Sequence, residues 1–286
     1  MTLFSIIGHP LTHALSPVIH NAAYKAMGLD AHYEGWDTPP ADVGAAIERM
    51  RANDDHQGMN VTVPHKQAVM QFLDEVETTA KAIGAVNTIE KRNGRLIGHN
   101  TDRSGYIRSL TEAGCAIKGK SVLIVGYGGA ERAIAYGLAE AGATSIGILG
   151  RRPEGVTQAL AQLRATAPFA MNLVAVSEDE QDLRRNVLAA DIVVNATPIG
   201  MAHTGTEGTS PIPGALLQPG QWVSDAVYNP LETELLRLAR ERHAHVVDGL
   251  GMLIYQAADA IKIWTGRDAP VDIMRAAAMK ALGFEE

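Results

Sequence analysis

The hydrophobic positions in the first third of the chain alternate between short continuous runs and runs with helical spacing. Residues 4–8 and 58–63 are apolar runs typical of buried strands. Between them, residues 16–28 carry apolar side chains three and four positions apart, and Ser16 followed by proline favours a helix N-cap there. A second helix is expected over residues 41–50. This order of elements predicts a parallel sheet with helices on both faces.

A β-hairpin is predicted between residues 86 and 100, after a helical pattern that resumes at His65. Asn93 and Gly94 stand between two short apolar runs, and both residue types accept the positive φ that a two-residue turn requires. We expect this hairpin to close the first domain.

The second half of the chain has a more regular strand–helix–strand pattern. An apolar strand at residues 121–125 leads into a glycine-rich turn and a helix that ends at Ala141. Such a unit predicts a doubly wound sheet of the Rossmann type. Residues 249–283 are expected to be helical and to pack back on the first domain. Further strands are expected at residues 144–149, 173–176, 191–195, 222–225 and 245–247.

The length of 286 residues allows two domains. The predicted fold class is α/β, with two three-layer α/β domains. The N-terminal domain comprises residues 1–101 joined by the returning helices of residues 249–286, and residues 102–248 form a Rossmann-like domain.

Composition and charge exclude several classes of function. The net charge is −7 and the pI is near 5.8, without a run of basic residues, so nucleic acid is not an expected partner. The chain has no apolar run of about 18 residues and no secretory signal pattern, so we expect a cytoplasmic protein without a membrane partner. Cys115 is the only cysteine, which excludes an intramolecular disulfide and a multi-cysteine zinc site. The histidines lack the spacing of a metal site, so no metal is expected.

The segment from Gly126 to Ala130, GYGGA, follows an apolar strand and opens a helix. Glycines permit a tight turn and close approach to a pyrophosphate, and the helix N-terminus supplies N–H groups and partial positive charge. Gly128 and Gly129 continue the motif, but Glu131 occupies the position of its last glycine. The segment predicts a dinucleotide site, with a purely structural strand-to-helix turn as the alternative.

The next strand ends in Gly150, Arg151 and Arg152, where an NAD enzyme carries the acid that binds the ribose 2′-hydroxyl. A guanidinium pairs with a 2′-phosphate and gains little from a hydroxyl, so the sequence favours NADP over NAD. Glu154 nearby keeps NAD open, and two solvated loop arginines remain the structural alternative.

Three polar clusters are not required by packing: NVTVPHK at 60–66, GAVNT at 84–88 and NTD at 100–102. Together they resemble the shikimate dehydrogenase family. The likeness extends to residues 8–21 (GHPLTHALSPVIHN), 195–201 (NATPIGM), 225–230 (DAVYNP) and 248–256 (DGLGMLIYQ), in the family's order.

The resemblance implies reversible NADP-dependent reduction of 3-dehydroshikimate to shikimate, a step toward chorismate and the aromatic amino acids. It implies a substrate-binding first domain, a cofactor-binding Rossmann domain and a cleft between them, in a monomer or homodimer. It assigns catalysis to Lys66 and Asp102. Substrate contacts fall to Ser16, Asn60, Thr62, Asn87, Tyr228 and Gln256. Cofactor contacts fall to Gly126, Gly128, Gly129, Ala130, Gly150, Arg151, Arg152, Thr197, Gly249 and Met252.

Oxidation of a secondary alcohol requires a hydride acceptor and a group that takes the hydroxyl proton. Burial of Lys66 would favour its neutral amine, whereas a neighbouring Asp102 carboxylate would favour the ammonium. We therefore expect Lys66 mainly to stabilise oxyanion charge and relay the proton, with a role as true base left open. Alone, each residue could instead be a solvated charge or a helix cap.

This chain departs from the family motif at one position. Two serines, two positions apart, bind the substrate carboxylate in the family, whereas this chain has Ala14 and then Ser16. Unless Thr12 or His13 replaces it, one charge-assisted hydrogen bond of about 1.5–3 kcal/mol is missing. Quinate or another carboxylated ring alcohol therefore stays open as substrate, and so does an NADP-binding regulator without turnover.

Overall fold

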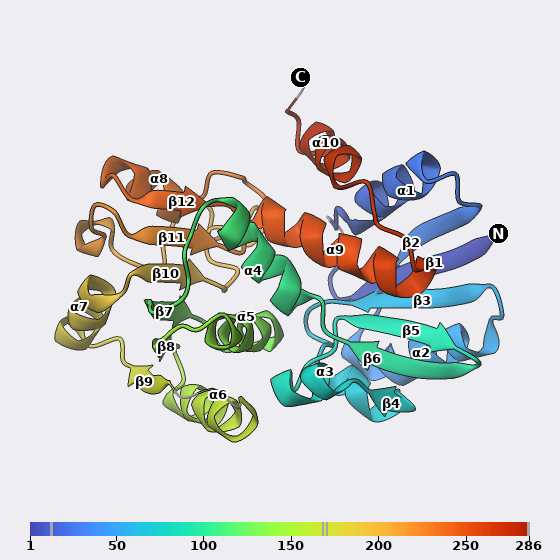
Figure 1. Ribbon diagram of the computed structural model, residues 1–286, viewed down its shortest axis with the longest axis horizontal. Helices are drawn as coiled ribbons and strands as arrows, with labels where there is room; N and C mark the ends of the chain where they lie inside the picture. Colours follow the sequence, from blue (N-terminus) through green and yellow to red (C-terminus); the bar gives the residue numbers. More distant parts are fainter. Residues whose placement is uncertain (12–13, 168, 170, 285–286) are drawn as a thin grey trace. The chain divides into compact units, whose positions relative to one another are not determined.

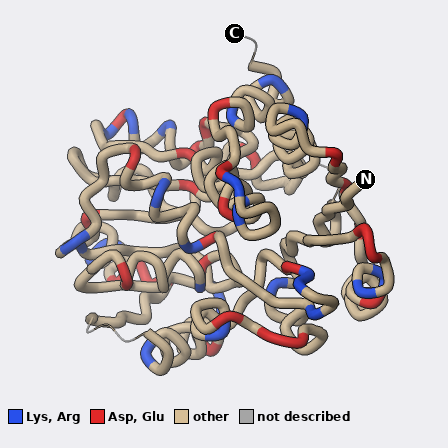
Figure 2. Tube along the Cα trace, turned by 45° about the vertical axis from the view of Figure 1, so that its right-hand side comes forward, with Lys and Arg blue, Asp and Glu red and all other residues tan. Residues whose placement is uncertain are grey.

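The computed structural model describes residues 1–11, 14–167, 169 and 171–284. The chain divides into two compact units, Met1–Gly105 with Ile254–Glu286, and Tyr106–Leu253. Within the described ranges, no helix is long and apolar enough to cross a membrane. Charged residues of both signs are interspersed along the chain (Figure 2).

The first unit contains a mixed six-stranded sheet in the order β2-β1-β3-β5-β6-β4 (Figure 1). Strands β1, β2 and β3 are parallel, but β5 is antiparallel to β3 and to β6. The predicted parallel arrangement is confirmed for β1, β2 and β3, and the predicted hairpin is formed by β5 and β6. The sequence did not predict that β5 would pair antiparallel with β3, which makes the whole sheet mixed. Asn93 and Gly94 form the hairpin turn with φ of 53° and 76°. The strands are β1 (Thr2–Gly8), β2 (Ala31–Asp37), β3 (His56–Val61), β4 (Glu75–Val76), β5 (Thr88–Arg92) and β6 (Arg95–His99).

Helices of the first unit begin and end close to the predicted positions, with two corrections. Helix α1 (Ser16–Ala26) has Leu15 as its N-cap residue, so Ser16 is the first helical residue and not the cap. The helix expected from His65 is replaced by a 3₁₀ turn (Ala68–Phe72), strand β4 and the short α3 (Thr78–Ile83). The N-terminal segment of this unit extends to Gly105.

Helix α2 (Val43–Ala52) follows a 3₁₀ turn (Pro40–Asp42). The C-terminal helices are α9 (Gly249–Thr265) and α10 (Val271–Ala281). Residues 254–286 belong to the first unit, where α10 packs against α1. Helix α4 (Asp102–Glu112) begins in the first unit.

The second unit contains a parallel six-stranded sheet in the order β12-β11-β10-β7-β8-β9, the doubly wound arrangement that the sequence predicts. Its strands are β7 (Ser121–Val125), β8 (Ser145–Leu149), β9 (Asn172–Val176), β10 (Ile192–Asn195), β11 (Trp222–Asp225) and β12 (His245–Val247). Its own helices are α5 (Gly129–Glu140), α6 (Pro153–Thr166), α7 (Glu180–Ala189) and α8 (Glu234–Glu241), with a 3₁₀ turn at Gly214–Leu216.

Each unit has its own apolar core. In the first, Ile7, Val61 and Ile89 are buried at the ends of adjacent strands. In the second, Val125 and Leu149 are buried at the carboxyl ends of β7 and β8. These cores hold the strand ends rigidly, so polar residues that follow them have defined positions.

Candidate active site

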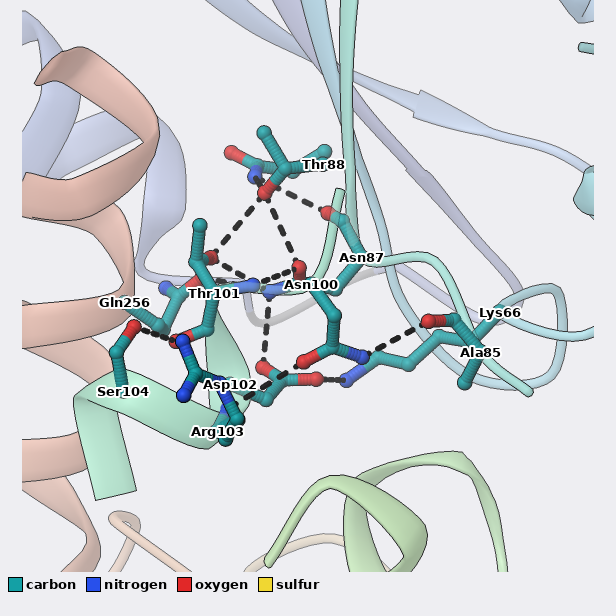
Figure 3. A network of polar contacts seen from close by, with 11 residues as sticks. Lys66, Ala85, Asn87, Thr88, Asn100, Thr101, Asp102, Arg103, Ser104 and Gln256 are labelled. Carbon is teal, nitrogen blue, oxygen red and sulfur yellow. Dashed lines mark hydrogen bonds and ion pairs between the residues drawn. The ribbon is translucent and has the colours of Figure 1, made fainter. Parts of the chain in front are cut away.

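Lys66 and Asp102 form an ion pair in the first unit. Nζ of Lys66 donates to Oδ2 of Asp102 over 2.7 Å, and only 11% and 6% of the two side chains is exposed. Lys66 lies in the loop after β3, where its carbonyl accepts a hydrogen bond from the N–H of Val86. Asp102 is the first residue of α4. The structure thus brings together two charged side chains from distant segments (Figure 3).

The ammonium of Lys66 has more donors than its protein partners use. A lysine ammonium has three N–H donors. Among the residues that the structure describes, Asp102 is the one hydrogen-bond partner of Nζ. A nearly buried ammonium with donors to spare stabilises a negatively charged or carbonyl oxygen placed against it.

Asn87 fixes the carboxylate of Asp102 from the other side. Its Nδ2 donates to Oδ1 of Asp102 over 3.0 Å and to Oγ1 of Thr101 over 2.9 Å, and it lies 3.3 Å from Oε1 of Gln256. An amide has two N–H donors, so the contact to Gln256, the longest of the three, is the weakest. The Oδ1 of Asn87 accepts from the N–H of Thr101 over 2.7 Å. The residue before Asp102 is therefore held at both its backbone and its side chain.

Asn60 supports this network from strand β3. Its Nδ2 donates to Oγ1 of Thr88 over 3.0 Å, and its Oδ1 accepts a hydrogen bond of 2.6 Å from the hydroxyl of Tyr33. Burial raises the pKa of Tyr33 well above its usual value, and a side-chain hydrogen bond with Ser16 opposes that rise. Tyr33 also stacks on the buried ring of His20, with centroids 4.0 Å apart. The buried amide of Asn60 therefore has hydrogen-bond partners for both its oxygen and its nitrogen, and it holds Thr88 in place.

The remaining predicted substrate residues lie in different places. Ser16 is buried beside Tyr33, and Thr62 is half-buried after β3. Gln256 lies on α9 against α4: a Cβ on Gly105 would be 2.6 Å from its backbone nitrogen, so glycine permits this close approach. Tyr228 belongs to the second unit, in the loop after β11. Thr12 and His13, the predicted substitutes for a serine at position 14, lie outside the described residues.

The glycine-rich turn of the second unit joins β7 to α5. Gly126 has a φ of 112°, which residues with a side chain rarely adopt. Gly128 is the N-cap residue of α5, and Gly129 and Ala130 form the first turn of that helix. The first N–H groups of a helix have no partner within it and attract anions.

Other predicted cofactor residues assemble around this turn. The N–H of Gly126 donates to the carbonyl of Leu149 over 2.8 Å, which places Gly150, Arg151 and Arg152 beside the turn. Cγ2 of Thr197, after β10, is 3.1 Å from the position of a Cβ on Gly126. All of these residues follow parallel strands at their carboxyl ends, where open α/β sheets bind ligands.

Gly249 and Met252 lie at the start of α9. Gly249 donates its N–H to the carbonyl of Val227 over 3.2 Å, and a Cβ on it would be 2.4 Å from the carbonyl oxygen of Ala226. The side chain of Met252 is 8% exposed. The close backbone approach shows why glycine stands at 249.

The departure at Glu131 has a structural consequence. Its two carboxylate oxygens are each 2.8 Å from the position of a Cβ on Gly126 or Gly128. The sequence therefore places an anion on the turn itself, at the N-terminus of α5, where the helix dipole favours it.

Neither a three-ligand metal cluster nor an ionised thiol is found among the described residues. Within the part of the chain that the structure describes, no group of three or more His, Cys, Asp or Glu side chains could hold a metal ion. Burial raises the pKa of the Cys115 thiol to about 11, so it stays protonated at neutral pH.

Comparison with known proteins identifies the family. A profile described as the shikimate dehydrogenase substrate binding domain matches residues 6–89, and one described as the shikimate 5′-dehydrogenase C-terminal domain matches residues 249–279. A shikimate dehydrogenase (NADP(+)) from Moorella thermoacetica is 45% identical over 98% of this chain and 94% of its own. The chain belongs to the shikimate dehydrogenase family.

Two solved structures resemble this protein over nearly the whole chain. The shikimate 5-dehydrogenase from Thermus thermophilus, in complex with NADP(H) and shikimate, is 36% identical with a TM-score of 0.87, over 98% of this chain and 100% of the other. A quinate dehydrogenase from Corynebacterium glutamicum, in complex with NAD, is 33% identical with a TM-score of 0.89, over 98% and 99% of the two chains.

Sequence reasoning missed two tyrosines, one beside the polar clusters and one in the glycine-rich turn. Tyr33 lies in β2 in an ordinary polar–apolar pattern, and no local signal marks its hydroxyl as the partner of Asn60. Tyr127 occupies the variable position of a glycine motif, where nothing local marks its ring. The hydroxyl of Tyr127 accepts a hydrogen bond from Nε of Arg152, and that of Tyr33 donates to Asn60, so both contacts join segments far apart in the sequence.

Proposed function

We propose that this protein is an NADP-dependent oxidoreductase that interconverts 3-dehydroshikimate and shikimate. The observation that carries the proposal is the pair of Lys66 and Asp102, nearly buried, tied to Asn87, and retaining donors toward a ligand. Family membership supports it, because the Moorella thermoacetica relative is named for NADP(+) and the Thermus thermophilus structure contains shikimate with NADP(H).

The residues of the chain suit the chemistry of a secondary alcohol. When bound, NADP⁺ accepts the hydride that the carbinol carbon loses, and NADPH returns it in the reverse direction. The hydroxyl proton passes to the Lys66–Asp102 pair and from there to solvent. In the reduction direction, the ammonium of Lys66 donates a hydrogen bond to the ketone oxygen and stabilises the charge that develops there. Asn87 keeps the carboxylate of Asp102 oriented toward Nζ.

The second unit fits a phosphorylated dinucleotide. The turn at Gly126 and the N-terminus of α5 suit a pyrophosphate, and Arg151 and Arg152 suit a 2′-phosphate. No acidic residue stands in the three positions after β8, where an NAD enzyme would bind the ribose hydroxyls. These features support NADP over NAD.

A second candidate substrate follows from position 14. Ala14 has no hydroxyl, and the hydroxyl of Ser16 is engaged with Tyr33, so a carboxylate at this point would meet fewer donors than the family motif supplies. Quinate or another carboxylated ring alcohol stays open as the alternative substrate, and a quinate dehydrogenase is among the similar structures. Quinate carries the same carboxylate as shikimate, so the missing donor does not by itself separate the two.

The deciding experiment is steady-state kinetics on shikimate and quinate, each with NADP⁺ and with NAD⁺. We expect the highest kcat/KM for shikimate with NADP⁺. Lys66→Met should lower kcat by a factor of about 100 or more with a small change in KM. Ala14→Ser should lower KM for shikimate by about tenfold if a missing carboxylate contact limits binding.

Two results would contradict the proposal. Binding of NADP⁺ without turnover of any ring alcohol would identify a regulator. A kcat unchanged in Lys66→Met would remove the pair from the reaction.

A further inference from the structure

The ring of Tyr127 is enclosed by two glycines that are distant from it in sequence. A Cβ on Gly150 would be 2.4 Å from Cδ1 of the ring, and a Cβ on Gly155 would be 2.4 Å from Cε2. Both distances are shorter than real Cβ contacts, so the ring occupies the space that side chains at these two positions would need. Gly150 follows β8 and Gly155 lies in the first turn of α6. The ring is therefore fixed between the end of a strand and the start of a helix.

The hydroxyl of Tyr127 forms a hydrogen bond with Arg152. Nε of Arg152 donates to the Tyr127 oxygen over 2.7 Å, and its guanidinium carbon is 5.7 Å from the ring centroid. A guanidinium has five N–H donors, one of them on Nε. Among the described residues, the hydrogen bonds of the Arg152 side chain use Nε alone. The four N–H groups on its two terminal nitrogens therefore remain for a ligand.

We propose that Tyr127 is a positioning residue that holds the terminal nitrogens of Arg152 toward the 2′-phosphate of the dinucleotide and so helps to select NADP over NAD. This inference rests on the proposed function, because it takes the turn at Gly126 as the dinucleotide site. An exposed arginine loses rotamer freedom when it binds a ligand. A hydrogen bond from Nε to a fixed hydroxyl removes part of that loss beforehand, because the planar guanidinium is already oriented.

The test compares two small probes that differ by one phosphate, adenosine 2′,5′-bisphosphate and 5′-AMP, by titration calorimetry on the whole protein. Tyr127→Phe keeps the ring between the two glycines and removes only the hydroxyl. We expect it to weaken binding of the bisphosphate by about three- to tenfold and to leave 5′-AMP within about twofold. Arg152→Met should weaken the bisphosphate by about ten- to a hundredfold. In the Arg152→Met background, Tyr127→Phe should have no further effect.

Three outcomes would overturn the inference. In the first, Tyr127→Phe weakens binding of both probes equally. In the second, Tyr127→Phe weakens binding of the bisphosphate as much in the Arg152→Met background as in the wild type. In the third, Tyr127→Phe leaves the affinity for the bisphosphate unchanged. A different result addresses the proposed function itself: wild-type protein that binds the two probes equally, or neither, would show that the turn is not an NADP site. The two failures are therefore distinguishable.

Discussion

Breaking the Lys66–Asp102 pair from either side should have unequal effects on stability. At 2.7 Å and an effective dielectric constant of about 20, the attraction between the two charges is about 6 kcal/mol before desolvation is subtracted. Removal of one partner from a buried pair costs about 3–5 kcal/mol, because the other charge is left uncompensated. Asp102 would still accept from Asn87 after loss of Lys66, whereas Lys66 would lose its partner after loss of Asp102.

We therefore expect Asp102→Asn to lower the free energy of unfolding of the first unit by about 3 kcal/mol and Lys66→Met by about 1–2 kcal/mol. The double variant should lose less than the sum, because it removes both charges. Such coupling is the signature of a direct interaction.

Tryptophan fluorescence can report on this unit alone. Trp36 and Trp264 belong to it, and Trp222 belongs to the second unit. In a Trp222→Phe background, urea unfolding followed by fluorescence measures the first unit for the wild type, both single variants and the double variant. Circular dichroism of each variant at zero denaturant controls for a change of fold.

Two results would refute this reasoning. Additive losses within about 0.5 kcal/mol would show that the two charges do not interact in solution. A larger loss for Lys66→Met than for Asp102→Asn would show that Asn87 does not hold the carboxylate.

Three further predictions follow from other contacts. Burial lowers the pKa of His20 to about 3, so the unfolded chain binds a proton below about pH 6.5 while the folded chain does not. This group alone should lower the free energy of unfolding by about 2 kcal/mol between pH 6.5 and 4.5. His20→Phe, followed by circular dichroism, should therefore lose less stability over the same range. Tyr33→Phe should cost about 1–3 kcal/mol in urea unfolding because it leaves the buried Oδ1 of Asn60 without its donor, and a loss under about 0.5 kcal/mol would mean that another group replaces the hydroxyl. Glu131→Ser should tighten NADP⁺ binding by about three- to tenfold in calorimetry, because it removes a carboxylate from the glycine-rich turn. Glu140→Gln, at the other end of the same helix, should change the affinity by less than about twofold. Equal effects of the two variants would show that the position of the Glu131 charge beside the turn does not matter.

Local patterns in this sequence predict much of the fold. The Rossmann-like sheet could be predicted because its first strands, β7, β8 and β9, are apolar runs that are each followed by a helix. A parallel sheet that is buried on both faces requires that pattern. The hairpin at Asn93 and Gly94 could be predicted because few residue pairs accept positive φ at both turn positions. The likeness of the polar clusters to one family was equally visible, since those clusters are contiguous.

Only the tertiary structure determines which residues of the three polar clusters contact one another. Whether Lys66 meets Asp102, and whether Asn87 lies beside both, depends on how β3, the hairpin and α4 pack, which no local pattern contains. The mixed direction of the first sheet and the enclosure of the Tyr127 ring have the same origin. Side-chain patterns record which face of a segment is buried, but the partner across that face is chosen by packing between distant segments.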